Sequence, residues 1–304
     1  MLLLATLIAL SQDAAQPGLS DLLSRVAEEA EVLQQNAPKS LTLEILEQRA
    51  LKPATRFRPR LGKAATVPQP PRLVVRQIIS EYSVGALKES AVQNLTELRQ
   101  VISVDGRRVQ SAERARHALS LGITSPDDRV RKRMLEDFAS HGLVDIATDY
   151  GIFLLAFSKR GLENMKVAIS GEEPVGADPA WVLTWQQTSP DGGVLEFLGN
   201  QASRRALQGR LLVRKSDGLP LRIHAWSEHS QAGHTIRDEA TVDYVQSPHG
   251  FLTPASVVHR HMVDGQVITE NLYRYEPFKM FSADAEIKFT ELETPPQPPP
   301  PIKK

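Results

Sequence analysis

Histidines are the residues of this sequence whose type and spacing come closest to a metal-binding pattern. Six of the eight lie between positions 224 and 261, and His259 and His261 are two residues apart in a segment expected to be a strand. Side chains two apart on a strand leave the same face, as two ligands of one zinc ion must. His224, on a neighbouring strand, is the best candidate for a third ligand. The alternative is that these rings simply occupy the solvated face of a sheet, and we expect no bound metal or other cofactor.

Glu81 and Glu97 are the second pair that could do chemistry. They lie on two strands of an expected hairpin and could oppose each other across it. Glycosidases need two carboxyl groups about 5 to 9 Å apart. No other feature marks a sugar cleft, so paired surface acids are the favoured interpretation.

Other catalytic and cofactor motifs are missing from the sequence. Cysteine is absent, which excludes thiol nucleophiles, disulfides and cysteine-based metal sites. We find no phosphate loop, H-E-x-x-H, G-x-S-x-G or dinucleotide-binding glycine motif. The 36 basic residues equal the 36 acidic ones and aromatic residues make up only 6%, a composition not typical of nucleic-acid binding. We therefore predict a protein that is not an enzyme and has no nucleic-acid partner.

The first residues predict export. Positions 2–10 are nine apolar or small residues, too few to span a bilayer but typical of the apolar region of a signal peptide. Small residues follow, so we expect residues 1–15 to be a signal peptide cut near Ser11 or Ala15, and the protein to be periplasmic or secreted. The run lacks a preceding Lys or Arg, and the alternative is an apolar turn that packs on the domain.

The elements that would position these side chains follow from periodicity and capping residues. Apolar residues spaced three and four apart predict a helix over 19–35, and two further helices are expected at 111–121 and 126–141. The helix at 126–141 has Ser125 as its amino-terminal cap and Gly142 as its carboxy-terminal stop. The apolar run 152–157 fits a helix or a buried strand, and we favour a helix.

Strands are predicted before and after this helical region. Residues 71–84 and 95–109 alternate apolar and polar positions and suggest an antiparallel pair around a loop at 85–94. Turn signals at Asp217-Gly218 and Asp264-Gly265 support hairpins in the second half. There the strands are expected at 165–169, 181–187, 194–198, 209–215, 221–227, 235–245, 256–263 and 267–275. The pattern indicates an α+β protein with an antiparallel sandwich or barrel.

One domain is expected over residues 16–291. A proline-rich basic segment at 52–71 should form an extended loop, since it carries no acidic residue and little that can be buried. The proline-rich tail 292–304 should not join the domain, because proline prevents helix and central-strand pairing.

The second half of the chain resembles a known family. Its segments GRLLVRKSDGLPLRIHAW, DEATVDYVQSPHGFLTPASVVHRHM and ENLYRYEPFKMFSADAEIKF follow one another as in LolA-like periplasmic lipoprotein-carrier domains, over residues 73–289. The motifs SEYS, VDGRRV and LPLRI are also similar to those of uncharacterised secreted bacterial proteins. The resemblance implies a curved, incompletely closed antiparallel β-barrel, or half-barrel, with an N-terminal helix and inserted lid helices around an apolar cavity.

The resemblance also implies a ligand and a place for it. An acyl chain or lipoprotein is expected between the concave sheet face and the lid, and possible roles are envelope lipid or lipoprotein trafficking. In the strands that open the family pattern, Leu212, Leu219, Leu221 and Ile223 are expected to face the cavity. The predicted ligand-binding residues are Ile223, Val242, Tyr244, Val258 and Leu272. The alternatives are an envelope sensor or scaffold that binds a protein partner and, third, a metal-dependent enzyme built on the histidines.

Overall fold

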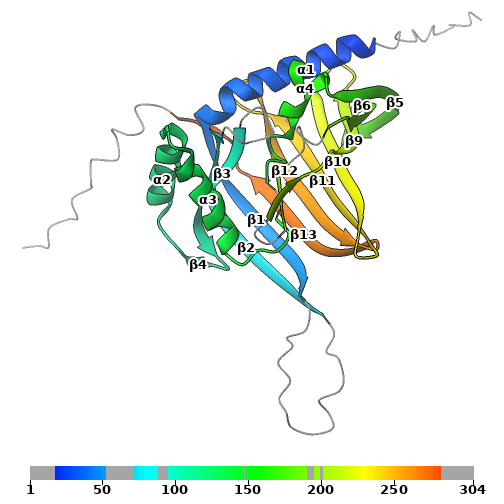
Figure 1. Ribbon diagram of the computed structural model, residues 1–304. Helices are drawn as coiled ribbons and strands as arrows, with labels where there is room; N and C mark the ends of the chain where they lie inside the picture. Colours follow the sequence, from blue (N-terminus) through cyan, green and yellow to red (C-terminus); the bar gives the residue numbers. More distant parts are fainter. Residues whose placement is uncertain are drawn as a thin grey trace, which may run out of the picture.

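The structure is a computed structural model. It describes residues 18–52, 71–87, 95–146, 148–189 and 205–281, and the backbone of 195–198 and 201–204. Its main feature is a twelve-stranded antiparallel sheet with the order β4-β3-β2-β1-β13-β12-β11-β10-β9-β6-β5, in which β14 also pairs with β1 (Figure 1). The strands are β1 (Ser40–Lys52), β2 (Arg72–Ala86), β3 (Leu95–Val104), β4 (Arg107–Arg108), β5 (Met165–Val175), β6 (Asp178–Gln187), β9 (Gln208–Arg214), β10 (Pro220–Gln231), β11 (His234–Gln246), β12 (Leu252–Val263), β13 (Gln266–Tyr275) and β14 (Lys279–Met280).

The sheet is strongly curved but does not close, because its two outer strands, β4 and β5, do not pair with each other. A separate short hairpin, β7 (Leu195–Leu198) with β8 (Gln201–Arg204), lies outside it. The predicted fold class, an α+β half-barrel with an N-terminal helix and inserted helices, is confirmed. The Asp264-Gly265 turn is confirmed as well, with both residues at positive φ, as a type I′ turn requires.

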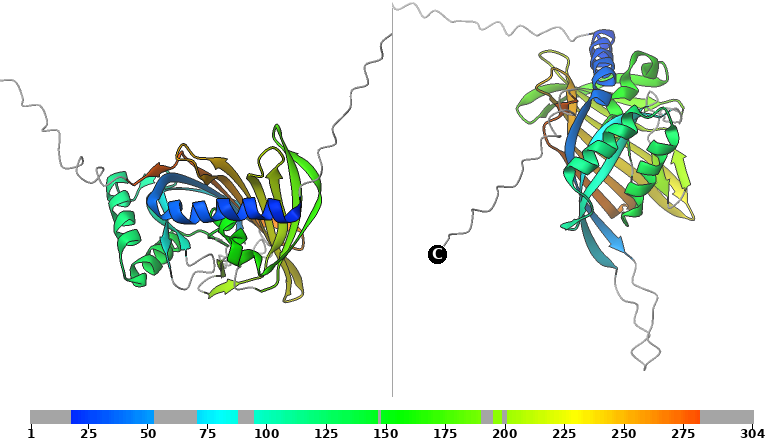
Figure 2. Two further views of the ribbon diagram at one scale, coloured as in Figure 1. Left: turned by 90° about the horizontal axis from the view of Figure 1, so that it is seen from above. Right: turned by 90° about the vertical axis from the view of Figure 1, so that its left-hand side faces the viewer.

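Three long helices of the described residues accompany the sheet, and all three were predicted. Helix α1 (Leu19–Asn36) lies across one open end of the half-barrel (Figure 2). Helices α2 (Ala112–Thr124) and α3 (Asp128–Ser140) pack beside β2 and β3. The α3 helix begins two residues later than predicted because Asp127, not Ser125, caps it by accepting a hydrogen bond from the Arg129 N–H.

The strand order requires a crossover. Strands β1 to β4 build one side of the sheet in sequence, and the chain then reaches the opposite edge, β5, before returning to β13 beside β1. The connecting segment contains α2, α3, the 3₁₀ helix η3 (Phe153–Phe157) and α4 (Lys159–Leu162). Since η3 shares one buried cluster with α1 and the inward side chains of the sheet, this crossover passes through the concave side.

Several segments differ from the sequence expectation, among them the unpredicted short strands β8 and β14. Strand β1 was not predicted, although SLTLEILEQ alternates apolar and polar residues as a half-buried strand does. The run 152–157 forms a 3₁₀ helix rather than a longer helix. The predicted signal peptide, the tail at 292–304 and nearly all of the loop at 52–71 lie outside the described residues.

None of the helices in the described part of the chain is both long and apolar enough to cross a membrane.

Candidate functional site: the filled concave face

The concave face is built from side chains that occupy matching register positions on neighbouring strands. One row of these residues, from β6 to β2, consists of hydrophobic residues, and all of its members are buried in the main core cluster. The row consists of Leu183, Leu211, Ile223, Val242, Val257, Tyr273, Leu46 and Ile78. A row of this kind forms a continuous apolar wall, because alternate residues of every strand point to the same side.

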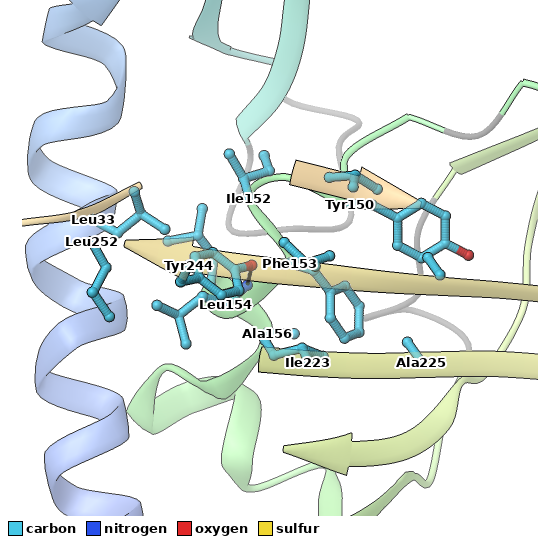
Figure 3. Close-up of a cluster of buried hydrophobic side chains, with 14 of the residues drawn as sticks. Leu33, Tyr150, Ile152, Phe153, Leu154, Ala156, Ile223, Ala225, Tyr244 and Leu252 are labelled. Atoms are coloured by element: carbon cyan, nitrogen blue, oxygen red, sulfur yellow. Dashed lines mark hydrogen bonds between the residues drawn. The ribbon is translucent and has the colours of Figure 1, made fainter. Parts of the chain in front are cut away.

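A segment of the crossover fills the space inside this wall. We call residues 150–157 the plug. Every one of them is buried, from Tyr150 to Phe157 (Figure 3). Phe153 lies 5.5 Å from the ring of Trp185, and Tyr150 stacks on His259 at 5.5 Å between centroids. The Leu154 N–H donates to the Tyr244 hydroxyl at 3.0 Å. The apolar wall of the half-barrel is therefore covered by the chain itself.

Small residues on the wall make room for the plug. In the row next to the apolar one, Gly209, Ala225 and Ala240 are adjacent across β9, β10 and β11, with Trp185 at one end and His259 at the other. These three positions carry at most a methyl group, and the two flanking rings are those that touch Phe153 and Tyr150. The shape of the wall thus matches flat, bulky groups.

The start of the plug is held by paired acidic residues. The Glu97 carboxylate accepts hydrogen bonds from the backbone N–H groups of Asp149 and Gly151, at 3.0 and 2.8 Å, and from the Tyr82 hydroxyl at 3.0 Å. In return the Asp149 carboxylate accepts from the Glu97 N–H at 2.8 Å and from the Thr96 hydroxyl at 2.9 Å. We call this reciprocal contact the Glu97–Asp149 latch.

Arg99 compensates part of the negative charge of the latch. Arg99 is 3% exposed, and its guanidinium donates twice to Glu44 at 2.7 and 2.8 Å and once to Glu97 at 2.7 Å and faces three aromatic rings. Burial, together with the charge of Glu97, raises the pKa of Asp149 to about 7. Arg99 is thus the positive charge next to three buried carboxyl groups, those of Glu44, Glu97 and Asp149. Asp149 titrates near neutral pH.

The five predicted ligand-binding residues do not share a face. Ile223, Val242 and Tyr244 lie in the core cluster on the concave side. Val258 and Leu272 pair with each other one position beyond Val257 and Tyr273, so they point to the convex side and are only partly buried. The same alternation places Leu212 and Leu221 outside the main core, in a small cluster with Ala180 and Val182, where the sequence had suggested that they face the cavity.

The three candidate metal ligands are separated in the same way. His259 and His261 point inward, and both are buried. His224 pairs with Thr241 and faces outward, where its Nε2 lies 3.8 Å from Glu239. A shared site is not formed, and in the described ranges no group of three or more His, Cys, Asp or Glu residues is arranged to hold a metal ion.

The proposed opposition of Glu81 and Glu97 is also wrong. Glu97 pairs with Val84, and Glu81 with Gln100. Glu97 is part of the latch inside the half-barrel, whereas Glu81 binds Arg116 of α2 at 2.8 Å on the other side of the sheet. Glu81 lies three positions from Val84, the partner of Glu97, and an odd offset along a strand reverses the face to which a side chain points.

A shallow open depression of about 370 Å³ also lies over β5, β6, β9 and β10, lined by residues that include Lys166, Thr184 and Trp226. Its lining combines scattered polar residues with two tryptophans, Trp185 and Trp226, and Lys166 is its one charged residue, so no charged pair converges on it. The plug, the latch and the concave wall are therefore the candidate site. Sequence reasoning missed the latch and Arg99, because charged residues in a strand normally indicate its solvated face.

Comparisons with known proteins give a likeness of fold. No protein-family model and no curated protein matches the sequence. Among solved structures, the chain is similar to a protein described as an outer-membrane lipoprotein-sorting protein domain from Vibrio parahaemolyticus, with 10% identity, a TM-score of 0.36, and 90% of this chain and 98% of that chain covered. It is also similar to a LolA superfamily protein from Nitrosomonas europaea, with 10% identity, a TM-score of 0.30 and coverage of 87% and 96%. A DUF1329 family protein from Desulfovibrio piger gives 9% identity, a TM-score of 0.36 and coverage of 91% and 98%. The chain therefore has structural similarity, at low sequence identity, to LolA superfamily and DUF1329 proteins.

Proposed function

We propose that the protein binds an apolar ligand with an acyl chain on the concave face of its half-barrel, in the space that the plug now fills, and that it acts as a non-enzymatic carrier. One observation carries this proposal. The apolar wall is covered by a short 3₁₀ segment, FLLAF, whose five side chains are all buried and which belongs to a crossover rather than to the sheet. An acyl chain offers the wall the same kind of surface as this segment.

The energies of the two occupants are comparable. Each buried methylene contributes about 0.8 kcal/mol, so a 16-carbon chain gives roughly 12 kcal/mol before ordering costs. Burying a Phe or Leu side chain contributes about 1.5 to 3 kcal/mol, so the four Phe and Leu residues of FLLAF give a total of the same order. Exchange of plug for ligand is therefore close to balanced, as reversible loading and release require.

The latch allows the plug to be exchanged for a ligand without unfolding the rest of the domain. Its polar contacts hold the chain at Asp149 and Gly151, and the end of the plug continues into the short helix α4. Breaking the contacts to Glu97 frees one end of the plug, while α1 and the strands keep their own hydrogen bonds.

The test compares two tryptophan variants. Val242→Trp places a large ring in the concave wall, whereas Val258→Trp places the same ring on the neighbouring strand, β12, on the convex side. Binding of palmitate, methyl palmitate and 1-monopalmitoylglycerol is measured by native mass spectrometry. We expect at least tenfold weaker binding of every bound lipid in Val242→Trp and unchanged binding in Val258→Trp.

A second variant tests displacement of the plug without altering the wall. The chain has no cysteine, and the Thr96 hydroxyl lies 2.9 Å from the Asp149 carboxylate, so Thr96→Cys with Asp149→Cys brings two thiols close together. We expect lipid binding when this variant is reduced and loss of binding when it is oxidised. No lipid bound by the wild type, or equal binding by the locked and reduced forms, refutes the carrier function and leaves a protein-binding role.

A further inference from the structure

The end of the concave face near the β10–β11 and β12–β13 turns is polar. We call the inward residues Ser227, Asp238, His259 and His261 the polar end. Ser227 is paired with Asp238, and Asp238 with His261, in adjacent register positions of β10, β11 and β12. All four are buried, and they continue the same face as the apolar wall. An acyl chain on the wall would place its head group beside them.

A chain of hydrogen bonds fixes the protonation of His259. The Val144 N–H donates to Gln48 Oε1 at 2.9 Å, which orients the amide so that Gln48 Nε2 donates to Asn271 Oδ1 at 2.6 Å. Asn271 Nδ2 then faces His259 Nδ1 at 3.1 Å and donates to it. A ring whose Nδ1 accepts a hydrogen bond carries its proton on Nε2 when it is neutral, and burial lowers the pKa of His259 to about 4.

The proton on His259 Nε2 lacks a hydrogen-bond acceptor among the described residues. His259 is 2% exposed, and its Nε2 has no hydrogen-bond partner among the described residues. The nearest charged group is Asp238, whose Oδ1 lies 3.9 Å away and already accepts from His261 Nδ1 at 2.6 Å. The Ser227 hydroxyl, opposite Asp238, is also buried without a partner. A buried polar group left in this way costs free energy, so a ligand that pairs with it gains affinity.

We propose that the polar end binds the head group of the carried lipid and selects a neutral hydroxyl, as in a monoacylglycerol or a fatty alcohol. A hydroxyl oxygen accepts from His259 Nε2–H while its proton is donated to Asp238 or Ser227. A carboxylate can accept from His259 but is repelled by Asp238. An ammonium can donate to Asp238 but leaves the His259 proton unpaired. This inference rests on the proposed carrier function and specifies its ligand.

The test uses three palmitoyl compounds that differ only at the head. These are 1-monopalmitoylglycerol, with hydroxyls and no charge, methyl palmitate, with neither hydroxyl nor charge, and palmitate, with a carboxylate. From two added hydrogen bonds we expect about tenfold tighter binding of the first than of the second, and the weakest binding for palmitate. Binding is measured by native mass spectrometry and by titration of tryptophan fluorescence, since Trp185 touches Phe153 of the plug.

Two variants assign the preference to the polar end. His259→Phe keeps a ring beside Tyr150 but removes the Nε2 proton, and Ser227→Ala is a smaller change in the same place. We expect His259→Phe to abolish the preference for the hydroxyl lipid and Ser227→Ala to reduce it about threefold, while methyl palmitate binding stays unchanged. His224→Phe, on the convex side, is the matched control and should keep the full preference. Thermal unfolding of each variant verifies that it is folded.

The outcomes separate the two proposals. Binding of all three lipids with equal affinity, or tightest binding of palmitate, overturns the hydroxyl preference and leaves the carrier function intact. The same equality is expected if only a trapped water pairs with His259. Absence of binding by all three lipids overturns the carrier function itself.

Discussion

At the scale of single residues, the interior of this half-barrel contains more acidic groups than basic groups to neutralise them. Glu44, Glu97 and Asp149 are all buried beside one arginine, Arg99. Buried ion pairs contribute little more to stability than well-packed apolar residues in their place would. Removing one member of such a pair is nevertheless costly, because the other charge is then buried without a partner. Glu97 contacts backbone N–H groups of the plug rather than only its charged neighbour. The charges of these buried groups therefore affect the position of the plug.

Asp149→Asn should remove a pH dependence of stability. Burial raises the pKa of Asp149 in the folded protein from its ordinary value of 3.8 to about 7, so its favourable contribution to stability is complete below about pH 4 and is lost as the pH rises through 7. An asparagine can keep the hydrogen bonds from Thr96 and the Glu97 N–H without the charge. We expect the variant to be more stable than the wild type above pH 7, by on the order of a few kcal/mol.

The measurement is urea unfolding at several pH values between 4 and 8. The difference in unfolding free energy between variant and wild type should grow across this range. Asp137→Asn, an exposed position on α3, should show no such trend. A difference that is constant with pH would mean that Asp149 stays ionised throughout.

At the scale of elements, the plug is the part of the crossover that completes the core. Its side chains come from a short 3₁₀ helix, which by itself has poor hydrogen-bond geometry and little intrinsic stability. Packing against the wall and α1 therefore decides its conformation. The strands, in contrast, are held by long ladders of backbone hydrogen bonds. The plug is expected to be the least stable buried element among the described residues, as the proposed exchange with ligand requires.

Phe153→Ala should loosen the plug without unfolding the sheet. The ring is fully buried between Trp185 and Phe157, and truncation of such a residue costs about 3 to 5 kcal/mol. We expect this loss in urea unfolding, together with a change in tryptophan fluorescence and an unchanged far-ultraviolet spectrum. Leu121→Ala, at an exposed position of α2, should cost less than about 0.5 kcal/mol. Equal effects of the two substitutions would show that the plug does not support the core.

At the scale of the whole molecule, the crossover joins both sides of the sheet into one core. The main cluster contains residues from α1, from β1 to β3, from the plug and from β5, β6 and β9 to β13. The amino-terminal helix α1 begins at Leu19, after the end of the predicted signal peptide, so removal of residues 1–15 would leave it complete. The domain limits of 16–291 and the periplasmic or secreted location stay predictions.

Export predicts a shortened mature chain. From the nine-residue apolar run we expect cleavage near Ser11 or Ala15 when the gene is expressed with its own start in a bacterium that has a periplasm. Mass spectrometry of the protein from the periplasmic fraction measures the new amino terminus. Leu7→Arg, which places a charge in the apolar run, should retain the precursor in the cytoplasm. Recovery of the wild-type chain with Met1 intact in the soluble cytoplasmic fraction would contradict the prediction.

The sequence by itself determined the class of fold and most of its elements. Helix periodicity and turns such as Asp264-Gly265 are local features, because each depends on residues a few positions apart. Alternation located most of the strands for the same reason. The sequence also lacks a phosphate loop, H-E-x-x-H, G-x-S-x-G and a dinucleotide-binding glycine motif.

Only the tertiary structure decided which residues share a site. A strand has two faces, and bulges between residues such as Asp243 and Tyr244 change the register, so Val258 and His224 could not be assigned to a side from the sequence. Glu97 and Asp149 are 52 positions apart and meet only because the crossover passes through the concave side. The sequence likewise did not show that the apolar wall is covered by residues 150–157, because that depends on the order in which the strands are joined.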